Sequence, residues 1–185
     1  MYTLRTKFCQ PTEPQWRDAG HFLSTKLPLP MRAWLEDTGS LTARLRKKSA
    51  GQFSVRVLNQ AWALPHFSER ELLEMGEREW GLVREVLLCG RGEPWVFARS
   101  VMPARSLVGD LRQLRQLDSR PLGPLLFNTR SMRRGGYQFC QMPVAMLSQD
   151  IVGGDEQALW GRRSRFDLRD RPIMVSEIFL PAFQP

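Results

Sequence analysis

The sequence predicts an α+β fold, with a single antiparallel β-sheet of about six strands flanked by short helices. Apolar stretches with strand character are separated by turns rich in glycine and proline, so most are expected to be joined as hairpins. The predicted helices are all short. A length of 185 residues suits one domain, over residues 1–185, with enough chain for a sizeable core.

The proline-rich first thirty residues show little periodicity, and we expect them to lie along the surface. A short helix is predicted over residues 31–37, because Pro30 suits a helix start and Gly39 suits its end. Ser40 is a good N-cap for a second helix. The basic residues 44–48 suit the C-terminus of that helix, where the helix dipole favours cations.

Residues 52–64 alternate well enough to predict the first strand. Ser68 and Glu71 have the spacing of a capping box, which indicates a brief helix before Gly76.

The next two strands are predicted to form a hairpin. Residues 80–89 form an apolar strand, residues 90–94 contain the glycines and proline of a tight turn, and residues 95–102 form the returning strand. Within this hairpin Glu85 is interpreted as a solvated or cross-strand charge, and Glu93 as a turn residue.

Residues 106–117 have the strongest helical pattern in the chain, a leucine stripe that predicts a core-facing surface. The stripe consists of Leu107, Leu111, Leu114 and Leu117. Pro121 and Pro124 interrupt the helix, and residues 125–127 fit one further turn.

The C-terminal third begins with residues 129–154, which contain a possible strand at 137–142 and the glycines of 152–154. A strand over 161–168, a turn at 169–172 and a last strand through residue 177 complete the sheet. Alternation places four charged residues on one face of the penultimate strand, which is interpreted as solvent-facing. They are Arg163, Arg165, Asp167 and Arg169, and Arg162 is also interpreted as part of a solvated strand.

Composition excludes several functional classes. No apolar run reaches the ~18 residues of a membrane helix, and the N-terminus has no signal-peptide core, so the cytoplasm is expected. Cys9, Cys89 and Cys140 are far apart and are expected to be reduced and mostly buried. With only two histidines and no nucleophile motif, neither a metal centre nor a hydrolase triad is expected.

The net charge of +8 is compatible with nucleic acid, an anionic membrane or a polyanionic small substrate. Nucleic-acid binding is disfavoured because the chain lacks a recognition helix and clustered aromatic residues on a predicted surface.

One arginine and one glutamate are placed in the middle of apolar strands. Arg84 shares a strand face with Leu82 and Val86, and Glu177 shares one with Val175 and Phe179. A charge among apolar neighbours must be paired, solvated in a cavity or neutralised. The two side chains therefore either line a closed pocket for a small anion or simply pair with each other.

Four segments of the chain resemble the bacterial chorismate pyruvate-lyases of ubiquinone biosynthesis. They are VREVLLCGRGEPW at 83–95, PLG at 121–123, LWGRRSR at 159–165 and SEIFLPA at 176–182. The resemblance covers about residues 34–182. It implies a cofactor-free monomer that converts chorismate to 4-hydroxybenzoate and pyruvate, the first committed step of that pathway, in an internal pocket roofed by helical flaps.

The resemblance also implies roles for four residues. Arg84 matches the arginine that holds the ring carboxylate, and Glu177 matches the glutamate at the ring hydroxyl, which makes these two the candidate catalytic residues. Leu122 matches a residue whose backbone N–H binds the carboxylate, and Leu41 stands where a methionine with a similar backbone role is expected.

The chemistry of chorismate fits these residue types. A buried arginine binds a carboxylate bidentately and keeps its proton. Loss of the enolpyruvyl group and the adjacent ring hydrogen makes the ring aromatic, so orientation is needed more than a strong base. Desolvation favours neutral Glu177 and a neighbouring arginine favours the carboxylate, so its protonation state stays open.

A second function is compatible with the same sheet. Effector-sensing domains of bacterial transcription regulators share this architecture and bind a small aromatic molecule without converting it. Such regulators carry a separate winged-helix domain, for which no segment is predicted here.

Overall fold

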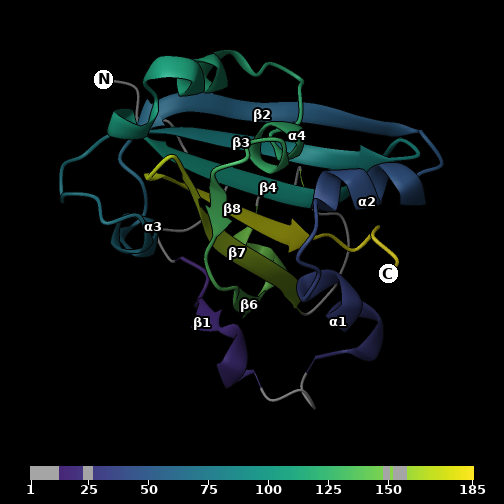
Figure 1. Cartoon of the computed structure of the whole chain (residues 1–185). Coiled ribbons are helices and arrows are strands. Elements are labelled where there is room, and N and C mark those ends of the chain that lie inside the picture. Colours follow the sequence, from purple (N-terminus) through teal and green to yellow (C-terminus); the bar gives the residue numbers. More distant parts are fainter. Residues whose placement is uncertain (1–12, 23–26, 148–150, 152–157) are drawn as a thin grey trace.

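The structure is a computed structural model that describes residues 13–22, 27–147, 151 and 158–185. It contains one eight-stranded sheet in the order β1-β6-β7-β8-β4-β3-β2, with β5 also paired to β7, and every pairing is antiparallel (Figure 1). The strands are β1 (Arg17–Asp18), β2 (Phe53–Ala63), β3 (Gly81–Gly90), β4 (Glu93–Pro103), β5 (Met132–Arg134), β6 (Gln138–Met142), β7 (Leu159–Leu168) and β8 (Arg171–Phe179). The predicted α+β class is confirmed.

The predicted strand count of about six is low because two strands are very short. β1 has two residues and β5 has three, which is too few for an alternating pattern. The opening segment does not only follow the surface, since Arg17 pairs with Phe139 and thereby adds an edge strand to the sheet. Residues 152–154, Cys9 and the first twelve residues lie outside the described part of the chain.

The described α-helices all have eight residues or fewer. They are α1 (Leu29–Leu35), α2 (Leu41–Lys48), α3 (Phe67–Leu72) and α4 (Gly123–Phe127), and the 3-10 helices are η1 (Ala19–His21), η2 (Ala104–Ser106), η3 (Gly109–Gln116) and η4 (Val144–Met146). Ser40 caps α2 as predicted, with its hydroxyl accepting from the N–H of Ala43 at 3.4 Å. The spans of α1, α2 and α4 lie close to the predicted helices.

The prediction of an α-helix over residues 106–117 is wrong, because residues 109–116 form the 3-10 helix η3 and Ser106 is the last residue of η2. Gly109 has a φ of +56°, outside the right-handed helical region, and interrupts the segment after Val108. The leucine stripe is nevertheless buried as predicted, in a cluster with Leu82 and Phe166.

The predicted hairpin turns are confirmed, whereas the predicted capping box is displaced. Arg91 and Gly92 join β3 to β4 with φ values of 55° and 87°, as the tight turn requires. The helix α3 begins at Phe67, so the capping residue is His66, whose N–H donates to Glu69 Oε2 at 2.9 Å, instead of Ser68.

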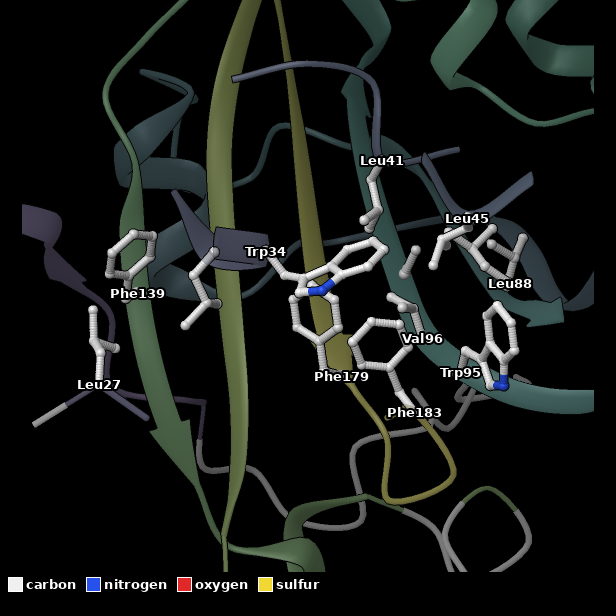
Figure 2. Packing of buried hydrophobic residues seen from close by; sticks show 13 residues of the cluster. Leu27, Trp34, Leu41, Leu45, Leu88, Trp95, Val96, Phe139, Phe179 and Phe183 are labelled. Atoms are coloured by element: carbon white, nitrogen blue, oxygen red, sulfur yellow. The ribbon is translucent and has the colours of Figure 1, made fainter. Parts of the chain in front are cut away.

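On one face of the sheet, two apolar clusters lie on either side of a central gap. The first holds α1 and α2 against β3, β4 and β8 through aromatic contacts of Trp34, whose ring centroid lies 4.8 Å from that of Phe183 and 6.5 Å from that of Phe179 (Figure 2). The second holds η3 and α4 through the leucine stripe. Alternation along the strands places Arg84 and Glu177 on this face, between the two clusters.

The opposite face carries buried charges. Arg99 donates to Glu69 Oε1 at 2.8 Å and to Glu85 Oε1 at 2.7 Å, and all three residues are buried. Glu85 is therefore a cross-strand partner of Arg99, and the alternative of a solvated charge is wrong. Arg163 is also buried, because its Nη1 donates to Ser68 in α3 at 2.7 Å, so the predicted solvent-facing surface is partly covered.

Two further expectations concern thiols and membranes. Cys89 and Cys140 are free and buried as predicted. Within the described residues, no helix is long and apolar enough to cross a membrane.

We predict that Glu69→Gln lowers the free energy of unfolding at pH 7 by about 1.5–3 kcal/mol, since a hydrogen bond to a charged group is lost. Burial would raise the pKa of Glu69, but the charge and hydrogen bonds of Arg99 outweigh this and lower it below its ordinary 4.5. The unfolded chain then binds the proton more readily. The stability from Glu69 is present above pH 4.5 and lost as the pH falls through the lowered folded-state value.

Denaturant unfolding at several pH values between 3 and 7 would measure this effect, with exposed Glu71 as the matched control. The acid loss of stability should be shallower in Glu69→Gln and unchanged in Glu71→Gln. Equal acid slopes in wild type and Glu69→Gln would contradict the prediction.

Candidate active site

A cavity occupies the gap between the two clusters. Its floor is the sheet face formed by β3, β4, β8 and β7, and its roof is formed by residues 39–42 and 121–127. The space not filled by atoms amounts to about 520 Å³, a figure that includes solvent at the cavity mouth, and about 40 Å³ of it can hold the centre of a water-sized sphere. Arg84, Glu177, Leu41 and Leu122 all line it, so the structure brings the four predicted site residues together.

The surroundings of the Arg84 side chain suit the binding of an anion. Its side chain is buried, and Nη2 donates to the carbonyl oxygens of Asp118 at 2.8 Å and Arg120 at 3.1 Å. The buried Nε has no hydrogen-bond partner among the described residues. Desolvation lowers the pKa of Arg84, although an arginine keeps its proton in proteins. A ligand carboxylate would supply the missing acceptor and counter-charge.

Glu177 is held by a different arginine from the one considered in the sequence. On β7, Arg162 lies directly opposite Glu177, and its Nε donates to Glu177 Oε2 at 2.6 Å. The alternative in which Arg84 and Glu177 simply pair with each other is therefore wrong. Arg162 uses Oε2, and no described residue donates a hydrogen bond to Oε1.

The strand register separates Arg84 from Glu177 across the cavity floor. Arg84 is opposite Ser100 on β4, whereas Glu177 is opposite Ala98 on the same strand. The two residues are thus two strand spacings apart, about 10 Å, and are offset by two residues along the strands. They can therefore contact opposite ends of one small ligand.

The roof consists of two chain segments that meet at the starts of helices. Leu41 is the first residue of α2 and Leu122 immediately precedes α4. No described residue accepts a hydrogen bond from either backbone N–H. A Cβ on Gly123 would lie 2.8 Å from Thr42 Oγ1 and 3.1 Å from Ser40 Oγ, so a glycine allows this close approach.

Two pocket residues, Arg162 and Arg134, were not predicted. Arg162 was assigned to a solvated strand but is 1% exposed, and its Nη1 donates to the carbonyls of Trp34 at 2.8 Å and Asp37 at 2.7 Å. It thus ties Glu177 to the end of α1. Alternation could have found it, because Arg162 lies between Trp160 and Ser164 on the face opposite Arg163.

The fold and the cavity define a class of protein, one with an arginine-lined cavity between helices and one face of an antiparallel sheet. The described residues contain no group of ligands suited to a metal ion. The chain belongs to the chorismate lyase family, whose model matches residues 11–184. The predicted family and its enzyme class, a lyase, are thereby confirmed.

Similar proteins support this assignment over nearly the whole chain. The chain is 42% identical over 171 residues to a protein of Pseudomonas fluorescens named probable chorismate pyruvate-lyase 2, covering 91% of this chain and 90% of that one. It is 40% identical over 154 residues to a probable chorismate pyruvate-lyase of Methylococcus capsulatus, covering 82% of this chain and 95% of that one.

Solved structures with the same fold are distant in sequence. The ligand-binding domain of a putative GntR-family regulator from Bordetella bronchiseptica has a TM-score of 0.54 at 16% identity, covering 72% of this chain and 87% of that one. PhnF from Mycobacterium smegmatis has a TM-score of 0.58 at 12% identity, covering 81% of this chain and 67% of that one. These similarities show the fold alone and agree with the predicted likeness to effector-sensing domains.

Proposed function

We propose that the protein is a chorismate pyruvate-lyase that acts as a cytoplasmic monomer, needs no cofactor and provides 4-hydroxybenzoate for ubiquinone biosynthesis. The observation that carries this proposal is the buried Arg84 Nε without an acceptor, at one end of a roofed cavity whose other end holds Glu177. Family membership and the names of the relatives agree with it.

In the proposed complex the ring carboxylate of chorismate accepts from Arg84. The backbone N–H groups of Leu41 and Leu122 add donors from the roof, and the free Oε1 of Glu177 faces the ring hydroxyl. Arg162 fixes the orientation of the Glu177 carboxylate through Oε2. This arrangement holds both ends of the ring and leaves the enolpyruvyl ether between them.

The reaction breaks the bond between the ring carbon and the ether oxygen and removes the hydrogen from the neighbouring ring carbon. The departing enolpyruvate gains a proton at its methylene carbon and becomes pyruvate, while the ring becomes aromatic. Aromatisation supplies the driving force, so positioning in a dry cavity contributes most of what the protein must add. The proton passes either through Glu177 or directly to the methylene carbon.

Incubating the purified protein with chorismate tests the proposal directly. Equal amounts of 4-hydroxybenzoate and pyruvate should form without added metal or cofactor, and a chelator should leave the rate unchanged. Binding of chorismate without any product would instead support the effector-sensing alternative and contradict the proposed lyase activity.

We predict that opening of the roof limits turnover. Residues 39–42 and 121–127 cover the cavity, so we expect ligand exit to require movement of these segments. Rapid mixing should show a burst of one product equivalent per enzyme and then a slower steady state. A linear trace from the first turnover, together with fast product release, would contradict this prediction.

The substitution Gly123→Ala tests the same prediction, that opening of the roof limits turnover. The added methyl group crowds Thr42 and Ser40 and separates the two roof segments, so product release should become several-fold faster and the burst smaller. Gly136→Ala is the matched control, because a Cβ there meets no atom within 4 Å. A slower steady state in Gly123→Ala would exclude roof opening as the limiting step.

A further inference from the structure

Arg134, the last residue of β5, lines the cavity without taking part in the contacts assigned so far. Its Nε donates to Ser164 Oγ at 3.2 Å and its Nη1 donates to the carbonyl oxygen of Thr38 at 3.2 Å. Its guanidinium carbon lies 4.1 Å from the centroid of the Tyr137 ring and 4.8 Å from that of Phe166. These contacts fix the guanidinium group but all involve neutral partners.

Arg134 forms no direct ion pair with a residue in the described part of the chain. No carboxylate of a described residue lies within 4.0 Å of it, whereas the neighbouring Arg162 is paired with Glu177. Arg162 Nη1 also donates to three carbonyl oxygens at and just after the end of α1, so this donor group is already occupied by the protein. Burial lowers the pKa of Arg134 because desolvation penalises its charged form. A partly buried cation that lines a ligand cavity and has no ion pair is well suited to bind an anion.

Arg134 and Arg84 approach the cavity from opposite sides. The strands run in the order β3, β4, β8, β7 and β5, so four spacings, about 19 Å, separate the two backbones. Glu177 on β8 lies between them, and the Glu177 charge acts on Arg134. Two arginines that form no direct ion pair with a described residue therefore face one cavity, with the carboxylate of Glu177 between their strands.

We propose that Arg134 binds the carboxylate of the enolpyruvyl group, so that the cavity recognises a dicarboxylate. This inference rests on the proposed function, in which Arg84 holds the ring carboxylate and Glu177 contacts the ring hydroxyl. The enolpyruvyl ether is attached to the ring carbon next to the one that bears the hydroxyl. Its carboxylate therefore lies on the Glu177 side of the ring, where Arg134 is found.

Such a contact distinguishes substrate from aromatic product. Chorismate engages both arginines, but once the ether bond breaks, the second carboxylate belongs to pyruvate and 4-hydroxybenzoate keeps only the first. Arg134 thus contributes affinity to the substrate and to the leaving group, and none to the retained aromatic product.

Two stable ligands isolate this contact. They are 3-(carboxymethoxy)-4-hydroxybenzoate and 3-(carbamoylmethoxy)-4-hydroxybenzoate, which have nearly the same shape and differ in one carboxylate. Calorimetric titration of the wild-type protein should show that the dicarboxylate binds about 10- to 100-fold more tightly, as expected for a charge-assisted hydrogen bond.

Arg134→Met should abolish this preference while changing the affinity for 4-hydroxybenzoate less than about threefold, and Arg134→Lys should keep part of it. In Arg84→Met both ligands should weaken together. No preference in the wild-type protein, or an undiminished preference in Arg134→Met, would overturn the inference. If Arg134→Met does not fold, the wild-type and Arg134→Lys preferences decide it.

Steady-state kinetics with chorismate separate this inference from the proposed function. Chorismate turnover by the wild-type protein tests the lyase activity without reference to Arg134. For Arg134→Met, the KM for chorismate should rise by a factor similar to the lost ligand preference. Turnover in the wild type with an unchanged KM in Arg134→Met would refute the role of Arg134 alone.

Discussion

Replacing Arg84 by alanine is expected to weaken binding of 4-hydroxybenzoate by about 2–5 kcal/mol. The substitution removes the buried guanidinium whose Nε has no acceptor among the described residues. The ligand carboxylate would then be enclosed without its counter-charge. Fluorescence or calorimetric titration with 4-hydroxybenzoate would measure the loss.

Arg84→Lys should recover only part of this affinity, because an ammonium group cannot reproduce the planar fork of a guanidinium group. Arg56→Ala is the matched control, since it removes one positive charge from exposed β2, outside the cavity lining. Wild-type affinity in Arg84→Ala, or an equal loss in Arg56→Ala, would contradict the assignment.

Glu177→Gln is expected to reduce turnover by about tenfold if the glutamate orients the ring, and by ~10²–10⁴ if it removes the proton as a general base. We expect the smaller loss. The amide oxygen can still accept from Arg162, so the side chain should keep its position. Aromatisation also reduces the need for a strong base. Single-turnover measurements report the chemical step without the contribution of product release.

Glu177→Ala complements this measurement because it also removes the acceptor for Arg162 Nε and leaves that buried arginine without its carboxylate. Its turnover should fall below that of Glu177→Gln, and thermal unfolding should confirm that the variant is folded. Turnover close to wild type in both variants would show that Glu177 has only a structural role.

Strand alternation was sufficient to predict Arg84 and Glu177, because each lies in a long strand with apolar neighbours on the same face. The same rule failed at Arg163 for a physical reason. Its face of β7 is covered by α3, and alternation identifies a face without showing what packs on it. Arg134 could not be found in this way, since a three-residue strand has no measurable period.

The two roof residues were predicted in a different way. Leu41 and Leu122 were chosen from resemblance to a family, and a backbone N–H leaves no signature in side-chain chemistry. The close approach of Gly123 to Thr42 depends on two segments that are far apart along the chain. Local sequence patterns therefore predicted the floor of the site but not the contacts that close it.

Two adjacent residues on β3 have opposite charges, so the pairing register of this strand determines the sign of the charge that faces the cavity. Arg84 faces the cavity and Glu85 faces Arg99 on the reverse side. A slip of β3 by one residue would exchange them, placing a carboxylate in the cavity and an arginine against another arginine. The misregistered sheet would repel an anionic ligand and lose its own ion pair at once. The same strand register therefore determines both the charge of the cavity and the pairing of the sheet, so a carboxylate bound to Arg84 would favour the correctly paired chain.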